Sequence, residues 1–451
     1  MLSSSTSKIT LIFRYSLLKI PNLVSFASSS FSISSLHSHS VPASTRQVDE
    51  AVDSFTRMLS MRRTPPIIQF NKILGSLSKT KHFHAAVSLF QQLQIRGIAP
   101  SVVTLSIVIN CCCGMGRMTL AFSVLAKIFR MGFQPDTITL TTILKGLCLC
   151  GSVEKAVRFH DRVLAHGFHF NQVTYGTLIN GLCKTGHTSA AIQVLRNIPR
   201  YGIAPDVFMY SAIIDSLCKD TLVNKAKYVF NTMAESRAFP NVRSYNIMIN
   251  GFCKSKMIDD ALDLFEEMRR KNLVPNTVTY STLIDGLGKS RRILCALELL
   301  EKMHDRGQPA NIVTYSSLMD ALFNIKQHDK ALMLFNQMKE SGIDPNIYTY
   351  NILIDGLCKS GRIKKAKEIF QDLSIKGYRP NVRTYTIMIN GLRKEGLLHE
   401  ALALMAKMED DGCLPNAVTY ETIIRALFEK GENDKAEKLL REMISRGLLQ
   451  G

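Results

Sequence analysis

The fold is decided by the stretch TYNILIDGLCK, which occupies residues 349–359. Its apolar side chains have the i, i+3, i+4, i+7 spacing of an amphipathic helix, at Tyr350, Leu353, Ile354 and Leu357. The same spacing returns after the turn at Ser360 and Gly361, in the stripe formed by Ala366, Ile369, Phe370 and Leu373. Residues 347–381 are therefore predicted to form two short helices joined by a turn.

This two-helix pattern recurs with a period of 35 residues from Ile67 to Gly451, without insertion or deletion. Eleven repeats fit the period, and they begin at residues 67, 102, 137, 172, 207, 242, 277, 312, 347, 382 and 417. The twentieth position is always alanine: Ala86, Ala121, Ala156, Ala191, Ala226, Ala261, Ala296, Ala331, Ala366, Ala401 and Ala436. A single helix pair cannot bury both apolar stripes, so we expect an all-α, right-handed superhelical solenoid of stacked helix-turn-helix repeats.

Glycine and proline mark the end of the second helix. The thirty-first position suits a left-handed backbone and is held by Gly97, Gly132, Gly167, Gly202, Gly307, Gly342, Gly377, Gly412 and Gly447. Asn272 tolerates that conformation, and Arg237 departs from the pattern. Proline three residues later blocks the helix, at Pro100, Pro135, Pro205, Pro240, Pro275, Pro345, Pro380 and Pro415. Phe170 and Ala310 replace this proline, and Pro199 is expected to kink a second helix.

The first 46 residues differ from the rest of the chain. They contain 15 serines and no acidic residue, and their positive charges are Lys8, Arg14, Lys19 and Arg46. This composition is typical of an organellar transit peptide. We therefore expect residues 1–46 to direct the chain to the mitochondrion, with the chloroplast as the alternative.

Two neighbouring segments also receive predictions. The apolar run at residues 9–20 is too short for a bilayer span and is interrupted by charge, so no membrane insertion is expected. Residues 47–66 are expected to form a capping half-repeat, since their apolar side chains have helical spacing: Ala51, Phe55, Met58 and Leu59.

The charge of the chain indicates the kind of partner. The net charge is +19 and the isoelectric point is near 9.5, which favours a polyanion. Nucleic acid and an anionic membrane surface both meet that description, and charge alone does not choose between them.

The stretch at 349–359, ended by Pro380 and Asn381, resembles the pentatricopeptide repeat of plant organelles, and the resemblance covers all eleven repeats. The phrase FNKIL at residues 70–74 is similar to the restorer-of-fertility-like branch of the P class. The resemblance implies a monomeric protein that binds single-stranded RNA, one base per repeat. It implies roles in organellar RNA processing, stability, splicing or translation, including fertility restoration, together with recruited processing factors.

In that family the fifth and thirty-fifth residues of a repeat face one base, and side chains at the second position sandwich it. The pairs carried over are Asn71 with Ser101, Ser106 with Asp136, Thr141 with Asn171, Asp206 beside Gly176, Ser211 with Asn241, Asn246 with Asn276, Ser281 with Asn311, Ser316 with Asn346, Asn351 with Asn381, and Thr386 with Asn416. They imply a target near 5′ CGAGACAACA 3′. Glu421, paired with the final Gly451, has no usable reading and is assigned to a cap.

The chemistry of these pairs is consistent with base reading. Asp accepts a hydrogen bond from the ring N–H of U or G, whereas the carboxamide of Asn suits the bare ring nitrogen and amine of A or C. Arg243 and Arg383 replace the branched apolar side chain of the second position. Base stacking, phosphate contact and simple solvation are all open for these two arginines.

A row of lysines at the thirteenth position is expected to contact phosphate: Lys79, Lys184, Lys219, Lys254, Lys289, Lys359 and Lys394. The alternative is a solvated helix end, where lysine favours the C-terminal helix dipole.

Other chemistries find little support in the sequence. Cysteines at the twelfth position of successive repeats lie too far apart to share a zinc ion and are expected to be packing residues: Cys113, Cys148, Cys183, Cys218, Cys253 and Cys358. His399 and Glu400 begin a zincin-like phrase that lacks its second histidine, and Lys184 lacks the glycine of a phosphate-binding loop. We therefore expect no catalytic site, metal or cofactor. A helical scaffold for protein partners is the alternative function.

Overall fold

The computed structural model describes residues 43–448, and within them every regular element is a helix. The predicted transit peptide lies outside the described residues up to residue 42, and so does the final Gly451. The helix before the first repeat, α2 (Ala43–Ser60), begins four residues ahead of the predicted capping half-repeat. None of the described helices is long and apolar enough to cross a membrane.

The first helix of every repeat covers its first to thirteenth positions. These helices are α3 (Ile67–Lys79), α5 (Val102–Gly114), α7 (Thr137–Leu149), α9 (Gln172–Lys184), α11 (Val207–Lys219), α13 (Val242–Lys254), α15 (Thr277–Lys289), α17 (Ile312–Asn324), α19 (Ile347–Lys359), α21 (Val382–Lys394) and α23 (Ala417–Glu429). The predicted period therefore gives the same boundaries in all eleven repeats.

The second helices cover the seventeenth to twenty-ninth positions, with one exception. They are α4 (Phe83–Ile95), α6 (Met118–Arg130), α8 (Val153–Ala165), α10 (Thr188–Asn197), α12 (Val223–Glu235), α14 (Ile258–Arg270), α16 (Ile293–Asp305), α18 (His328–Glu340), α20 (Ile363–Ile375), α22 (Leu398–Asp410) and α24 (Asn433–Ser445). The exception is α10, which gives way to a 3-10 turn, η1 (Ile198–Tyr201). Pro199 lacks the N–H for an α-helical bond, so the predicted distortion takes this form.

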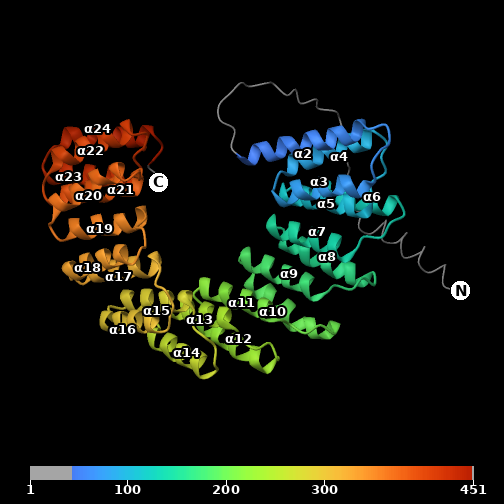
Figure 1. The fold of residues 1–451 in the computed structure, drawn as a ribbon, viewed down its shortest axis with the longest axis horizontal. Coiled ribbons are helices and arrows are strands. Elements are labelled where there is room, and N and C mark those ends of the chain that lie inside the picture. Colours follow the sequence, from blue (N-terminus) through green and yellow to red (C-terminus); the bar gives the residue numbers. More distant parts are fainter. Residues whose placement is uncertain (1–42, 449–451) are drawn as a thin grey trace. The chain divides into compact units, whose positions relative to one another are not determined.

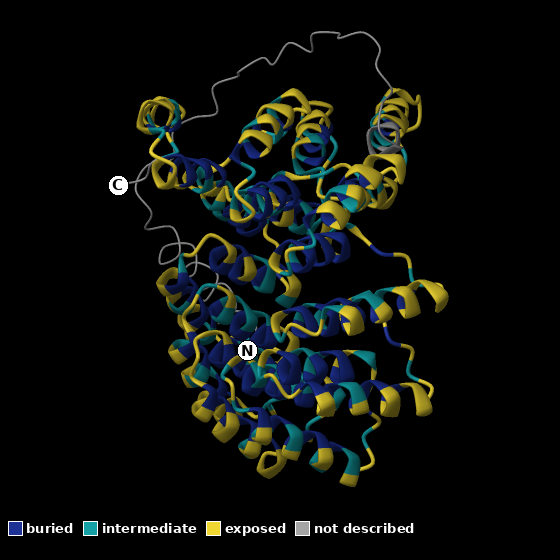
Figure 2. Ribbon diagram, turned by 90° about the vertical axis from the view of Figure 1, so that its left-hand side faces the viewer, coloured by how far each residue is buried: buried dark blue, intermediate teal, exposed yellow. Residues whose placement is uncertain are grey.

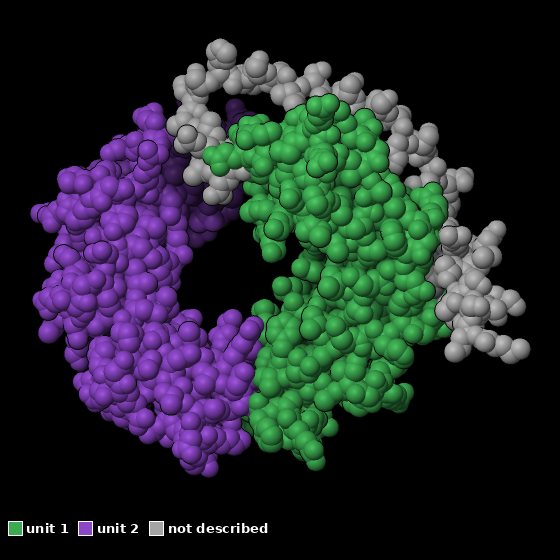
Figure 3. Space-filling model, turned by 45° about the vertical axis from the view of Figure 1, so that its right-hand side comes forward, with its two compact units in different colours: residues 1–239 green, residues 240–451 purple. Residues whose placement is uncertain are grey.

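The chain divides into two compact units, residues 1–239 and residues 240–451 (Figure 3). Within each unit the first helices of successive repeats lie side by side, and each second helix packs on the first helix of its own repeat (Figure 1). The buried residues follow the helix faces that meet (Figure 2), and most turn residues are exposed, although Pro135, Pro275 and Pro345 in the loops between repeats are buried. Each unit therefore has the stacked two-layer architecture of a solenoid, as predicted.

The core of each unit is built from small residues where helices approach closely. The alanine at the twentieth position is at most 1% exposed in every repeat. A Cβ added to Gly146 would lie 2.5 Å from the Sγ of Cys113, and one added to Gly181 would lie 2.5 Å from the Cβ of Cys148. These contacts confirm that the cysteines of the twelfth position pack between repeats. Burial raises the pKa of the Cys148 thiol to about 11, which keeps it protonated.

Two turns in each repeat require a left-handed residue. The turn at the thirty-first position was predicted, and Arg237 adopts it with φ 60° despite its side chain. The turn at the fifteenth position was predicted at Ser360 and Gly361, and the structure adds that its backbone is left-handed in every repeat. It also has positive φ where no glycine is present, as at Lys81, Thr221 and Lys326. Because this conformation costs a side-chain-bearing residue roughly 1–2 kcal/mol, the stacked helices must compensate for it.

Candidate nucleic-acid interface

The thirty-fifth residue of each of the first ten repeats caps the first helix of the following repeat. Its side chain accepts a hydrogen bond from a backbone N–H in the first turn: Asp136 Oδ1 lies 2.8 Å from Thr139 N, and Asn276 Oδ1 lies 3.1 Å from Thr279 N. The ten caps are Ser101, Asp136, Asn171, Asp206, Asn241, Asn276, Asn311, Asn346, Asn381 and Asn416. Caps of this kind stabilise a helix by about 1 kcal/mol.

Sequence reasoning missed this capping role, although its signal is visible. Ser, Asp or Asn is followed three residues later by Thr or Ser, directly ahead of an apolar run, in nine of the ten cases. That spacing lets the cap side chain reach the first-turn N–H groups. The side chains that the resemblance assigns to base reading therefore also hold the helices together.

A buried hydroxyl joins the two predicted base-reading positions. Thr279, the third residue of α15, donates to Asn246 Oδ1 at 2.7 Å and lies 3.1 Å from Asn276 Oδ1. Equivalent contacts link the fifth residue of one repeat to the third residue of the next at Asn71–Thr104, Ser106–Thr139, Thr141–Thr174, Ser281–Thr314, Ser316–Thr349 and Thr386–Thr419. The structure thus brings the fifth and thirty-fifth residues together within these repeats.

Exposed apolar side chains run beside these polar pairs. They stand at the second position of the first helices: Ile68, Val103, Ile138, Val173, Phe208, Val278, Val313, Tyr348 and Val418. Their exposure to water does not stabilise the folded chain. Arg383, one of the two exceptions, places its guanidinium carbon 5.6 Å from the ring centroid of Tyr348. That arginine therefore lies over an aromatic neighbour.

A hollow of about 600 Å³ opens at one of the predicted base sites. Arg243 and Val278, the second-position residues of two successive repeats, stand on its walls together with Asn246 and Asn276. The remaining lining residues are Val242, Ile247, Asn250 and Thr282. Its walls are apolar or cationic and carry carboxamides, which is the chemistry needed to hold a flat heterocycle by stacking and hydrogen bonds.

Comparison with known families agrees with this repeat geometry. The model of the PPR repeat family matches residues 65–114, 100–149, 170–219, 205–254, 240–289, 275–324, 310–359 and 349–394. Two further PPR repeat models match residues 138–168, 383–413 and 411–444. The chain belongs to the pentatricopeptide repeat family.

Relatives in this family include pentatricopeptide repeat-containing proteins of Arabidopsis thaliana. One is 38% identical over 72 residues, which cover 16% of this chain and 12% of the relative. A second, named as mitochondrial, is 42% identical over 67 residues, which cover 15% of this chain and 13% of the relative. The matched segments are thus a small part of each relative's length.

A solved pentatricopeptide repeat structure has the same fold. The crystal structure of PPR10 from maize matches with a TM-score of 0.51 and 22% identity, over 90% of this chain and 67% of the maize chain. PPR10 is also known in complex with an 18-nt psaJ RNA element, and that structure matches with a TM-score of 0.36.

The lysines of the thirteenth position divide into two groups. Lys219, Lys289 and Lys359 each lie 2.6 Å from an aspartate one turn earlier: Asp215, Asp285 and Asp355. The other four have Gly75, Asn180, Asn250 and Asn390 at that place and gain no such carboxylate from it. The positive charge of the lysine row expected to contact phosphate is therefore partly neutralised by aspartates of the same helices. The sequence analysis did not take this pairing into account.

The fourth repeat lacks most of the polar contacts seen in its neighbours. Gly176 replaces the fifth-position side chain, and Met209, the third residue of the next repeat, replaces the hydroxyl found there elsewhere. Asp206 still caps α11 by accepting from Met209 N at 2.9 Å. The space beside Gly176 is partly taken by the Phe208 ring, which would lie 3.4 Å from an added Cβ.

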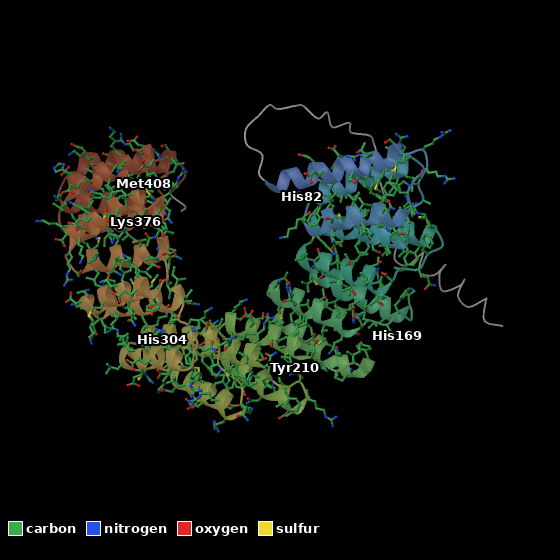
Figure 4. The ribbon with its side chains drawn as sticks, in the orientation of Figure 1. His82, His169, Tyr210, His304, Lys376 and Met408 are labelled. Atoms are coloured by element: carbon green, nitrogen blue, oxygen red, sulfur yellow. The ribbon has the colours of Figure 1, made fainter. Side chains whose placement is uncertain are left out.

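A second hollow, of about 910 Å³, follows the early end of α10. Pro199, Tyr210, Tyr228 and Lys225 are among its lining residues, and Tyr210 is labelled in Figure 4. No sequence-predicted site residue lines this hollow. It therefore belongs to the packing defect at Pro199 rather than to the row of polar pairs.

Proposed function

We propose that this pentatricopeptide repeat protein binds single-stranded RNA in an organelle, one base per repeat, and acts through binding alone. The observation that carries the proposal is the recurrence, every 35 residues, of an exposed second-position side chain beside a polar pair. Aromatic side chains at this position, Phe208 and Tyr348, can stack on unpaired bases for about 1–3 kcal/mol each, and the aliphatic ones can pack against the base faces. The polar pair then reads the edge of the base.

The basic character of the chain supports RNA over a protein partner. A net charge of +19 attracts the phosphate backbone and makes binding depend on salt. The predicted reading positions carry Asn, Asp, Ser or Thr in all but one of the first ten repeats, whereas a scaffold for protein partners has no need of that restriction.

Binding is tested with the purified full chain and a labelled RNA containing 5′ CGAGACAACA 3′, followed by fluorescence anisotropy. We expect tighter binding to this RNA than to a scrambled strand of the same composition or to its duplex. The scrambled strand controls for backbone attraction, because it carries the same charge. Absence of binding to any unstructured RNA at low ionic strength would overturn the proposal.

One substitution tests the reading frame. Asn351→Thr changes the fifth residue of the ninth repeat and is expected to move the preference at its base from C toward A. The matched control is Asn224→Thr on α12, a second helix that carries none of the predicted reading positions. Unchanged selectivity in Asn351→Thr would show that the pairing of positions with bases is wrong.

The cellular role follows from tight binding without chemistry. We propose that the protein protects an organellar transcript, exposes a site within it, or recruits processing factors to it. The mitochondrion is favoured over the chloroplast. Support comes from the serine-rich composition of residues 1–46, which lack acidic residues, and from the mitochondrial names of several relatives. The restorer-like role is the specific form of this proposal. Fusing residues 1–46 to a fluorescent protein tests the proposed localisation, and cytosolic fluorescence would contradict it.

A further inference from the structure

The third residue of the first helices is a buried hydroxyl where an apolar side chain would pack equally well. Thr139, Thr279 and Thr314 are 0% exposed. Valine has almost the same shape, and a buried hydroxyl without a partner costs free energy. The residue recurs in nine of the ten first helices that follow a cap: Thr104, Thr139, Thr174, Ser244, Thr279, Thr314, Thr349, Thr384 and Thr419. Its polar contacts must therefore explain its presence.

Those contacts reach both members of a predicted reading pair. Thr139 Oγ1 donates to Asp136 Oδ1 at 2.6 Å and lies 2.5 Å from Ser106 Oγ. In the sixth repeat the same role falls to Thr279, and Asn246 Nδ2 also donates to Asn276 Oδ1 at 3.3 Å. In the second repeat one hydroxyl can thus bond to both residues, by donating to Asp136 and accepting from Ser106. In the sixth repeat the single proton of Thr279 goes to Asn246 Oδ1, and Asn276 Oδ1 is held by Thr279 N and Asn246 Nδ2.

The capping bonds also decide which atom of the thirty-fifth residue is left over. The backbone N–H of the third residue needs an acceptor. The Oδ1 of a capping asparagine must therefore face this N–H, and its Nδ2 points away from it. The Nδ2 of Asn276 and the Oδ2 of Asp136 are left without a partner in the described part of the chain, and both residues are exposed. Asparagine therefore offers an unpaired donor at this place, and aspartate offers an unpaired acceptor.

We propose that the third-position hydroxyl is a positioning residue for base selectivity: by holding the reading pair, it fixes whether a donor or an acceptor meets the base. This inference rests on the proposed function. It assigns a role to residues outside the second, fifth and thirty-fifth positions. It also makes selectivity at one base depend on a side chain that does not touch that base.

The second and fourth repeats provide a comparison within the chain. Both have aspartate at the thirty-fifth position, but Asp136 is held by two bonds, of 2.8 and 2.6 Å, to Thr139. Among the residues that the structure describes, Asp206 has only the bond from Met209 N, and Gly176 offers no side chain beside it. The same carboxylate is thus fixed in the second repeat and loosely held in the fourth, so we expect sharper selectivity at the second base than at the fourth.

The test selects bound RNAs from a randomised single-stranded pool with the full chain and its variants. The readout is the base preference at each place of the recovered motif, so it does not require the base assignments to be correct. In Thr139→Val we expect discrimination at the second base to fall about fivefold to tenfold, with the preferences of other repeats unchanged. Thr139→Ser should restore it. The double variant Gly176→Ser with Met209→Thr should sharpen the fourth base.

Each remaining outcome is decisive. Thr232→Val on α12 removes a hydroxyl that only donates to Val229 O, and it serves as the control with no change in the motif. If Thr139→Val lowers the melting temperature or the affinity for all RNAs while the second base stays selective, the hydroxyl is a helix cap only and the inference is overturned. If wild type binds RNA without preference at the second base, the inference fails while the proposed RNA binding stands. Absence of all binding overturns both.

Discussion

The fourth repeat, residues 172–206, and the ninth, residues 347–381, share one backbone frame and differ in what it carries. Both have first helices that begin and end at the same positions, α9 and α19. The ninth has Asn351, which is buried, and Asn381 in its proposed reading positions, and Tyr348 is exposed beside them. The fourth has lost the fifth-position side chain to Gly176, and its second helix ends early at Asn197. The first helix of a repeat thus keeps its bounds where a proposed reading side chain is lost.

The largest expected effect tests the shared frame. A Cβ at Gly356 would overlap the Phe323 ring, and one at Gly181 would lie 2.5 Å from Cys148 Cβ. Gly181→Val and Gly356→Val should each lower the free energy of unfolding by about 2–3 kcal/mol, because overpacking a close helix contact forces backbone shifts. Urea unfolding followed by circular dichroism measures this.

Gly75→Ala is the matched control, since only Ile107 lies near its Cβ position, at an ordinary 3.8 Å. This helical glycine should gain roughly 0.5–1 kcal/mol on substitution. If Gly181→Val were harmless while Gly356→Val unfolded the chain, the two repeats would not share the frame described above.

The second prediction concerns the reading face. Tyr348→Ala in the ninth repeat should weaken RNA binding by about 1–3 kcal/mol, because it removes an aromatic ring on which a base can stack. It also removes the ring over which Arg383 lies. Val173→Ala in the fourth repeat should cost less, since valine offers no aromatic face. Anisotropy titrations measure both. The exposed Tyr228 on α12 is the control, and Tyr228→Ala should leave RNA affinity as it is.

The third prediction uses a buried phenol of the fourth repeat. The hydroxyl of Tyr175 is buried and has no hydrogen-bond partner in the described structure, whereas that of Tyr385 donates to Asp411. Tyr175→Phe should therefore raise the free energy of unfolding by about 1 kcal/mol, and Tyr385→Phe should lower it by a similar amount. Equal effects of the two substitutions would contradict this difference.

The same phenol has a pH consequence. Burial raises the pKa of Tyr175 to about 12, so the folded state favours its protonated form. Its contribution to stability is complete below pH 10 and is lost as the pH rises from about 10 to 12. Tyr175→Phe should flatten this part of the stability profile relative to wild type.

The smallest effect separates the two kinds of lysine. Lys184 in the fourth repeat has Asn180 one turn before it, whereas Lys359 in the ninth is paired with Asp355 at 2.6 Å. Lys184→Ala should lower affinity about threefold for all sequences and reduce the salt slope by up to roughly 0.7. Lys359→Ala should do less, and Asp355→Asn should strengthen binding. Larger losses for Lys359→Ala would mean that RNA displaces the aspartate.

Much of the fold could be predicted because its signals are local. The apolar spacing, the alanine of the twentieth position and the glycine and proline stops give the eleven repeats and their helix boundaries. The left-handed backbone at Lys81 and Thr221 was missed, because these residues do not favour it, although glycine holds the same position in other repeats, as at Gly116 and Gly361. The bond between Ser106 and Thr139 joins residues 33 positions apart. It depends on how one repeat stacks on the next, which no short stretch of sequence encodes.

The capping role of the thirty-fifth residue limits how such an array can be retargeted. Asparagine and aspartate cap a helix about equally well, so exchanging them changes the atom offered to RNA at little cost to folding. Most other side chains would fray the next helix. The residue types allowed at this position are therefore limited first by helix capping. A change of RNA target should destabilise the fold least when the new residue still caps the helix.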